Sequence, residues 1–217
     1  MTPQETLVQK INDHTAVVGV VGLGYVGLPL AVEKAKVGFR VIGVEQNPQR
    51  AAKINAGQNY IADVADADLA SVVADGRLSA ATDFSRVAEM DVIVVCVPTP
   101  LTKNLTPDLR HIENVTREIA QHLRPGQLVS LESTTYPGTT DEVMLPILEG
   151  SGLKVEEDFF LAHSPERVDP GNSATRRRTR ARSSAVSARA PSMSPSRSTG
   201  RRSWRSCRFP APRQPSS

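Results

Sequence analysis

Short apolar runs alternate with amphipathic segments along the first three quarters of the chain. Five runs rich in valine, isoleucine and leucine end at glycine, proline or a polar residue, which is typical of strands buried in a parallel sheet. These runs are residues 16–22, 40–44, 92–97, 128–131 and 159–162.

Between the apolar runs, hydrophobic residues recur at helical spacing. The clearest case is the segment 109–123, where Ile112, Val115, Ile119 and Leu123 fall on one face. Further helices are predicted at residues 25–37, 48–55, 66–74 and 140–148, and the first 15 residues are a polar lead-in with a short helical turn. Strands that alternate with helices predict an α/β fold: a Rossmann-like, doubly wound parallel sheet with helices on both faces.

The character of the sequence changes near residue 173. Residues 173–217 hold 12 of the 26 basic residues, all of them arginine, and none of the 23 acidic ones. The formal charge of +3 therefore combines an acidic first part with a basic tail. The tail is too poor in apolar residues to offset the entropy of ordering, so we predict a folded domain at 1–172 and a disordered tail at 173–217.

Two interpretations of the Arg/Ser-rich tail differ in what they imply. Its bias toward Arg, Ser, Pro and Ala is expected when a GC-rich gene is translated in a shifted frame, and we favour that origin. Alternatively, the arginines bind nucleic acid through its phosphates. The tail contains one tryptophan and one phenylalanine for stacking on bases, so nucleic-acid binding is the less favoured interpretation.

The distribution of apolar residues, cysteines and histidines does not fit a membrane protein, a disulfide-rich protein or a metalloprotein. The apolar stretch 17–32 is too short to span a membrane and is interrupted by glycines, and no signal-peptide pattern is visible, so we expect a cytoplasmic protein without membrane association. Cys96 and Cys207 are too far apart to suggest a disulfide framework, and Cys96 fits a buried hydrophobic position. The four histidines lack metal-ligand spacing, so no metal is expected.

The strongest chemical signal is the turn Gly22-Leu23-Gly24-Tyr25-Val26-Gly27. It follows a predicted strand, opens a predicted helix and is followed by an acid, Glu45, at the end of the next strand. Gly22 permits a tight turn, Gly24 lets the backbone approach a pyrophosphate, and Gly27 lets helix and strand pack closely. Glu45 can accept hydrogen bonds from ribose hydroxyls and would repel a 2′-phosphate, which favours NAD over NADP. The alternative is a glycine turn that only packs.

Other candidate residues follow later strands, where ligands gather in open α/β sheets. Arg50 is either a contact to the adenosine phosphate or ribose, or a solvated helix residue. Thr99 lies in a rigid Val-Pro-Thr-Pro turn, and Ser133 and Thr134 end the next strand. Glu166 is either a general base or the partner of a neighbouring arginine on the surface.

Taken together, these motifs resemble the UDP-glucose/GDP-mannose dehydrogenase family over about residues 10–172. The Gly-Leu-Pro-Leu continuation of the turn at 27–30 and the ending Ser-Pro-Glu-Arg-Val-Asp-Pro-Gly-Asn are most similar to the UDP-N-acetylhexosamine branch. The motifs that carry the resemblance are Val21–Leu30, Glu45–Arg50, Val97-Pro98-Thr99-Pro100, Glu132-Ser133-Thr134 and Ser164–Gly171.

The resemblance implies a homo-oligomeric, NAD-dependent enzyme that oxidises the C6 alcohol of a UDP-sugar to a carboxylate. In the family an aldehyde is captured by a cysteine, oxidised to a thioester and hydrolysed. It further implies that residues 1–172 form the NAD-binding domain, that Thr134 helps to position the catalytic water and that Glu166 takes part in proton transfer. The implied NAD contacts are Gly22, Leu23, Gly24, Tyr25, Val26, Gly27, Glu45, Arg50, Thr99, Ser133 and Thr134.

Two departures from the family pattern affect the expected activity. Glu45 stands where the family often has the shorter aspartate. The nucleophilic cysteine of the family, with its catalytic lysine, asparagine and aspartate, belongs to later segments that have no counterpart after residue 172. Without that thiolate the aldehyde cannot be held covalently. We therefore expect this chain to bind NAD but to be inactive alone. The alternative is a non-catalytic NAD-binding fragment whose tail associates with nucleic acid or a partner.

Overall fold

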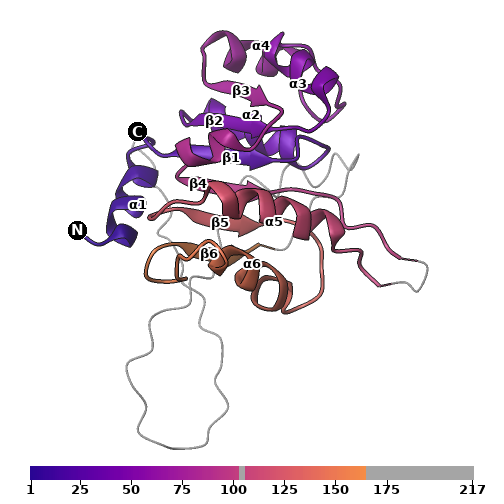
Figure 1. The fold of residues 1–217 in the computed structure, drawn as a ribbon. Helices are drawn as coiled ribbons and strands as arrows, with labels where there is room; N and C mark the ends of the chain where they lie inside the picture. The colour runs from indigo at the N-terminus through magenta and orange to yellow at the C-terminus, as the bar shows by residue number, and fades with distance from the viewer. Residues whose placement is uncertain (103–105, 165–217) are drawn as a thin grey trace, which may run out of the picture.

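The computed structural model describes residues 1–102 and 106–164, which form six parallel strands flanked by helices (Figure 1). The strands are hydrogen-bonded in the order β3-β2-β1-β4-β5-β6, which is the order typical of Rossmann folds. The predicted fold class is therefore confirmed. The tail at 173–217 lies outside the described residues, and its disorder stays a prediction.

The elements follow one another in the alternation that the sequence predicted. The strands are β1 Val17–Val21, β2 Arg40–Val44, β3 Leu78–Ala81, β4 Val92–Val95, β5 Leu128–Leu131 and β6 Phe160–His163. The helices are α1 Pro3–Asn12, α2 Gly27–Lys36, α3 Pro48–Asn55, α4 Asp66–Ala74, η1 Ser85–Glu89, α5 Arg110–His122, η2 Thr140–Met144 and α6 Leu145–Glu149.

Four parts of this list differ from the sequence prediction, and the first is the 3₁₀ helix η1, where no element was predicted. Strand β3 was missed because it is an edge strand of small, partly buried residues, Leu-Ser-Ala-Ala. The expectation of a short turn at the N-terminus was wrong: α1 is a ten-residue helix, begun by a capping box between Thr2 and Glu5. The helix expected at 140–148 starts as a π-turn before α6, and Pro146, which has no N–H, prevents a regular α-helical bond there.

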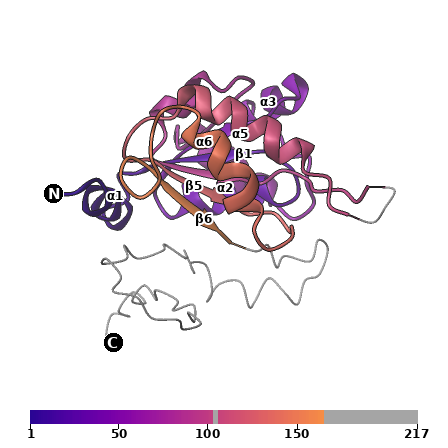
Figure 2. The ribbon, with the colours of Figure 1, turned by 60° about the horizontal axis from the view of Figure 1, so that its bottom comes forward.

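Hydrophobic side chains cover both faces of the sheet. Val18, Val20 and Val41 pack with α2 and α4 on one face, and Val95, Ile93 and Val44 pack with α5 and α6 on the other. Figure 2 shows α5 and α6 together on their face of the sheet. A sheet with both faces covered has strands that are continuously apolar, which is the pattern the sequence displays.

Helix α1 lies beside the end of the sheet where the strands begin (Figures 1 and 2). Its Leu7 packs against Leu128 and Ala162. The buried carboxylate of Asp91 accepts hydrogen bonds from Lys10 Nζ at 2.9 Å, the Val17 N–H at 2.9 Å and Arg124 at 3.0 Å. Asp91 therefore ties α1 to the starts of β1 and β4. In the described part of the chain, no helix is long and apolar enough to cross a membrane.

Candidate cofactor site

The site lies where the chain leaves the carboxyl ends of the strands. Strand β1 is central, with β2 on one side and β4 on the other. The connection that leaves β1 leads toward β2, and the connection that leaves β4 leads toward β5, so the two connections diverge to opposite halves of the sheet. The ladder continues one residue beyond the strands: the Gly22 N–H donates to the Val44 carbonyl at 2.9 Å, and the Cys96 N–H donates to the Val21 carbonyl at 2.8 Å. This geometry brings the glycine turn against the loop after β4, at the crevice where such sheets bind ligands.

The three glycines of the turn are required for three different reasons. Gly22 has a φ of 89°, and a Cβ there would lie 2.5 Å from the Cys96 carbonyl oxygen. A Cβ at Gly27 would overlap the Gly22 carbonyl oxygen, so Gly27 lets α2 pack onto the turn. At Gly24 a Cβ would meet no atom within 4 Å. Gly24 therefore faces open space that a side chain would fill, which is the room a pyrophosphate needs.

The start of α2 is left without a capping side chain. Val26 precedes the helix, makes no side-chain cap, and no acidic residue lies in the first turn. By contrast, Thr2 caps α1 and Asn47 caps α3 by accepting from the Gln49 and Arg50 N–H groups. The positive end of α2 is therefore available for an anion brought to the turn.

Glu45 follows β2 and is 8% exposed. Its N–H continues the sheet by donating to the Ala81 carbonyl, and its Oε1 accepts from the Asn47 N–H at 3.0 Å. These bonds hold the carboxylate beside the glycine turn. Asn47 in turn starts α3, so Arg50 is carried on the first turn of that helix.

Tyr60 joins these groups and was missed by the sequence analysis. Its hydroxyl donates to the Leu23 carbonyl at 2.6 Å, and the Arg50 guanidinium lies 5.6 Å from its ring centroid. Burial, and then the charge of Glu45, raise the pKa of Tyr60 to about 12, while Arg50 opposes them. No local pattern marks Tyr60, because its contacts are with residues far away in the sequence.

The two later candidate segments are bonded to each other. The Thr99 hydroxyl donates to the Thr134 carbonyl at 2.6 Å, and the Ser133 hydroxyl donates to the Val97 carbonyl at 2.8 Å. Ser133 is buried, whereas Thr134 is exposed. The structure thus brings Thr99, Ser133 and Thr134 together at the ends of β4 and β5, on the side of β1 opposite to Glu45.

The remaining residues singled out in the sequence are Glu166 and the two cysteines. Glu166 and Cys207 lie outside the described residues, so the predicted role of Glu166 stays a prediction. Cys96 is buried at the end of β4, as expected of a small hydrophobic residue. Within residues 1–102 and 106–164, no group of three or more histidine, cysteine, aspartate or glutamate side chains could hold a metal ion.

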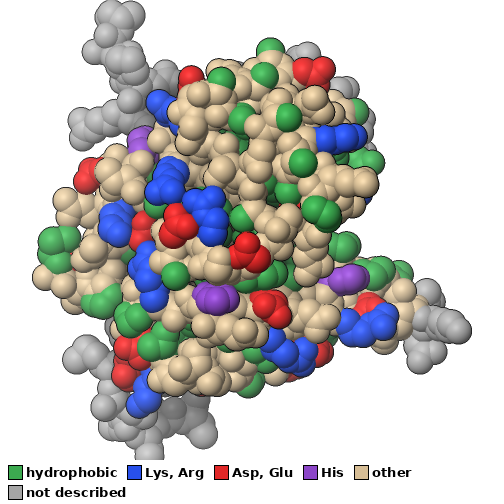
Figure 3. Space-filling model, turned by 45° about the horizontal axis from the view of Figure 1, so that its top comes forward, with side chains coloured by type: hydrophobic (Ala, Val, Ile, Leu, Met, Phe, Trp, Pro, Cys, Tyr) green, Lys and Arg blue, Asp and Glu red, His purple; other side chains and the backbone are tan. Residues whose placement is uncertain are grey.

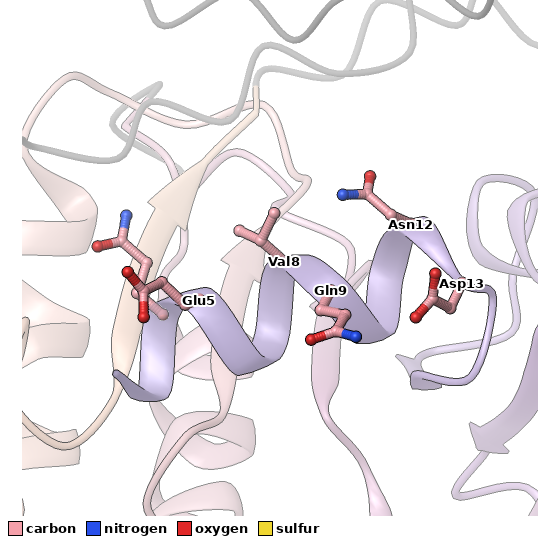
Figure 4. A pocket seen from close by; sticks show the side chains of 6 residues that line it. Glu5, Val8, Gln9, Asn12 and Asp13 are labelled. Carbon is pink, nitrogen blue, oxygen red and sulfur yellow. The ribbon is translucent and has the colours of Figure 1, made fainter. Parts of the chain in front are cut away.

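One shallow hollow on the surface lies away from these residues. Gln4, Glu5, Val8, Gln9, Asn12 and Asp13 line it, and all of them belong to α1 or its C-terminal cap (Figure 4). It is the outer surface of one helix and assembles no catalytic chemistry. On the face in Figure 3, acidic and basic side chains are interspersed, which is ordinary for a solvated surface.

Comparison with known proteins agrees with the fold and the glycine turn described above. Residues 16–182 match the model of the "UDP-glucose/GDP-mannose dehydrogenase family, NAD binding domain". A UDP-N-acetyl-D-glucosamine 6-dehydrogenase from Pseudomonas aeruginosa is 41% identical over 160 residues, which cover 73% of this chain and 37% of that enzyme. A UDP-N-acetyl-D-mannosamine dehydrogenase from Pyrococcus horikoshii is 37% identical over 155 residues, or 71% of this chain and 37% of its own length.

A solved structure of GDP-mannose dehydrogenase from Pseudomonas aeruginosa superimposes with a TM-score of 0.69 and 36% identity, covering 73% of this chain and 38% of that one. The chain thus spans little more than a third of the length of these relatives, and the part that matches is the part that contains the glycine turn. The chain belongs to the UDP-glucose/GDP-mannose dehydrogenase family and contains its NAD-binding domain.

Proposed function

We propose that this chain is the NAD-binding part of a UDP-sugar 6-dehydrogenase, an enzyme that oxidises a C6 alcohol to a carboxylate. The observation that carries the proposal is the glycine turn. It has open space at Gly24, an uncapped helix start behind it and a buried carboxylate, Glu45, at the end of the next strand. NAD⁺ supplies the hydride acceptor for such an oxidation.

Each candidate residue that the structure describes has a proposed role that its position supports. The backbone of Gly22–Gly27 receives the pyrophosphate, and Glu45 accepts hydrogen bonds from the adenosine ribose. Arg50 lies on the same side of β1, where it reaches the adenosine half. Thr99, Ser133 and Thr134 lie on the opposite side, where they contact the other half of the cofactor. Thr134 also helps to place the catalytic water. Glu166, which lies outside the described residues, moves a proton, a role that only the family resemblance supports.

The proposed substrate is a UDP-N-acetylhexosamine. The names of the relatives from Pseudomonas aeruginosa and Pyrococcus horikoshii support this class. The matched part is 37% of those enzymes. The family resemblance implies that the nucleophilic thiolate belongs to later segments. We therefore propose that the 217-residue chain binds NAD⁺ without turnover, and that a cytoplasmic location and homo-oligomeric assembly apply to the intact enzyme.

A pair of glycine substitutions tests the cofactor site. In Gly24→Ala, the new methyl group meets no protein atom and fills the space required by the pyrophosphate. We expect this variant to keep the unfolding midpoint of the parent and to lose at least tenfold in NAD⁺ affinity, measured by isothermal titration calorimetry. Gly27→Ala, whose methyl group overlaps the Gly22 carbonyl, should lose both binding and stability. Full NAD⁺ affinity in Gly24→Ala would contradict the proposed site.

A turnover assay tests the second half of the proposal. The chain is mixed with NAD⁺ and UDP-N-acetylglucosamine or UDP-N-acetylmannosamine, and absorbance of NADH is followed. We expect saturable NAD⁺ binding and no sustained NADH formation, since capture of the aldehyde needs a thiolate. Continued production of NADH by the purified chain would overturn the assignment of catalysis to later segments.

A further inference from the structure

Tyr60 connects the glycine turn to a distant part of the chain. Its hydroxyl donates to the carbonyl of Leu23, the second residue of the turn, over 2.6 Å. Leu23 itself is fully buried, and its side chain occupies the space that a Cβ at Gly43 would need. The turn is thus held at Leu23 by its side chain against β2 and by its carbonyl against Tyr60.

The same tyrosine ring supports Arg50. The guanidinium carbon lies 5.6 Å from the ring centroid, within the range of a cation–π contact. Glu45 is close enough to act electrostatically on the Tyr60 hydroxyl. One side chain therefore touches the turn and Arg50, beside the carboxylate that follows β2.

Tyr60 is held by an ordered segment. The neighbouring Asn59 donates through Nδ2 to the Ile61 and Val64 carbonyls, and its Oδ1 accepts from the Ile61 N–H at 2.9 Å. Ile61 is 3% exposed and joins the core on the α2 face of the sheet. The Tyr60 hydroxyl is therefore presented to the turn from a fixed position.

The bond to Leu23 has a consequence for the adjacent amide. A trans peptide is planar, with its carbonyl and N–H pointing to opposite sides. The carbonyl of Leu23 and the N–H of Gly24 share one peptide, and the backbone contains no cis bond in the described residues. Because Tyr60 fixes the carbonyl on one side, the Gly24 N–H is fixed on the other.

We propose that Tyr60 is a positioning residue for NAD, which orients the Leu23–Gly24 peptide toward the pyrophosphate and holds Arg50 on the adenosine side. This inference rests on the proposed function. Tyr60 acts through the turn and through Arg50, and it needs no contact of its own with the cofactor. Its hydroxyl and its ring have separable effects, which makes the inference testable with two substitutions.

The test compares ligands with and without a pyrophosphate. In the full chain, Tyr60→Phe removes the hydroxyl and keeps the ring beneath Arg50. We expect its affinity for NAD⁺ and ADP to fall about fivefold to tenfold, as for one lost hydrogen bond, with binding of adenosine unchanged. Titrations followed by nuclear magnetic resonance measure all three ligands. Tyr60→Leu, which also removes the ring, should weaken NAD⁺ and ADP further.

A second readout needs no ligand. Amide hydrogen exchange of the unliganded chain should be faster at Gly24–Val26 in Tyr60→Phe and unchanged in β1. Thr116→Val is the matched control, because it removes another hydroxyl-to-carbonyl bond, the 2.7 Å bond to Ile112 inside α5. This control should leave NAD⁺ affinity and exchange in the turn as in the parent chain.

The outcomes separate the inference from the proposed function. If the parent chain binds NAD⁺ and Tyr60→Phe binds NAD⁺ and ADP equally well, Tyr60 is only structural and the inference is overturned. Equal weakening of NAD⁺, ADP and adenosine overturns it as well, because the effect is then not on the pyrophosphate. If the parent chain binds no NAD⁺, the proposed function fails and the inference fails with it.

Discussion

At the scale of single residues, the partly buried hydroxyl of Tyr60, which lies close enough to Glu45 to feel its charge, resists ionisation. Burial, reinforced by Glu45 and opposed by Arg50, raises the pKa of Tyr60 to about 12. In an unfolded chain tyrosine ionises near ~10. The folded chain thus binds this proton more tightly, and the hydroxyl remains a donor to Leu23 throughout the neutral range. Its contribution to stability is fully present below pH ~10 and is lost as the pH rises through the folded pKa.

This titration predicts a difference between the parent chain and Tyr60→Phe in alkaline solution. As the pH rises from ~10 toward 12, the free energy of unfolding of the parent should fall more steeply, because only the parent has this hydroxyl to ionise. Urea unfolding at a series of pH values measures the difference, and the other tyrosines cancel in the comparison. Parallel curves for the two proteins would show that Tyr60 titrates normally in the folded state.

At the scale of elements, helix α1 depends on one carboxylate for its attachment to the sheet. Burial acts to raise the pKa of Asp91, but the bonds from the Val17 N–H, Lys10 and Arg124 outweigh it and the pKa lies below the usual value. A lowered pKa favours the folded state above the unfolded pKa of ~3.9, and this stability is lost as the pH falls through the folded pKa. The starts of β1 and β4 share the same carboxylate, so its loss affects three elements.

We expect Asp91→Asn to lower the free energy of unfolding by about 1–3 kcal/mol, since Lys10 and Arg124 lose a charged partner and an NH₂ group replaces one of the two accepting oxygens. The substitution should accelerate hydrogen exchange more at the backbone amides of α1 than at those of α2. Asp68→Asn is the control, because Asp68 pairs with Lys36 on the surface, where such pairs are worth about 1 kcal/mol or less. Urea unfolding compares the variants, and equal losses from both substitutions would contradict the assigned role of Asp91.

At the scale of the whole molecule, cofactor and fold are thermodynamically linked. The candidate site draws on the ends of β1, β2, β4 and β5, so NAD⁺ binds a surface that exists only when the sheet is assembled. A ligand at 100 times its dissociation constant stabilises the folded state by about 2.7 kcal/mol. We therefore expect NAD⁺ to recognise the assembled sheet and not one motif alone.

Thermal unfolding with each cofactor tests this link. NAD⁺ should raise the unfolding temperature, and NADP⁺ at the same concentration should raise it less, because the Glu45 carboxylate repels the 2′-phosphate. Glu45→Gln removes that charge at constant shape and should narrow the difference between the two cofactors. Equal stabilisation of the parent chain by NAD⁺ and NADP⁺ would show that Glu45 does not discriminate against a 2′-phosphate on the ribose.

Much of this fold could be predicted because its information is local. Valine-rich runs mark β1, β2 and β4, since strands buried on both faces need apolar side chains throughout. The glycine turn was recognisable because its backbone excludes side chains at Gly22 and Gly27. Edge strand β3 lacked that signal. Helix α1 did have a local signal, the capping box of Thr2 and Glu5, which the sequence prediction did not use.

The sequence by itself determined the fold class, the family and the glycine turn that we propose to hold NAD, because periodicity and the demand for small residues act between near neighbours. Only the tertiary structure decided that Gly24 faces open space, that Thr99 is bonded to Thr134, and that Tyr60 holds the turn and Arg50 together. The two hydrogen bonds join residues 35 and 37 positions apart, and these relations exist only once the sheet has set the strand ends side by side.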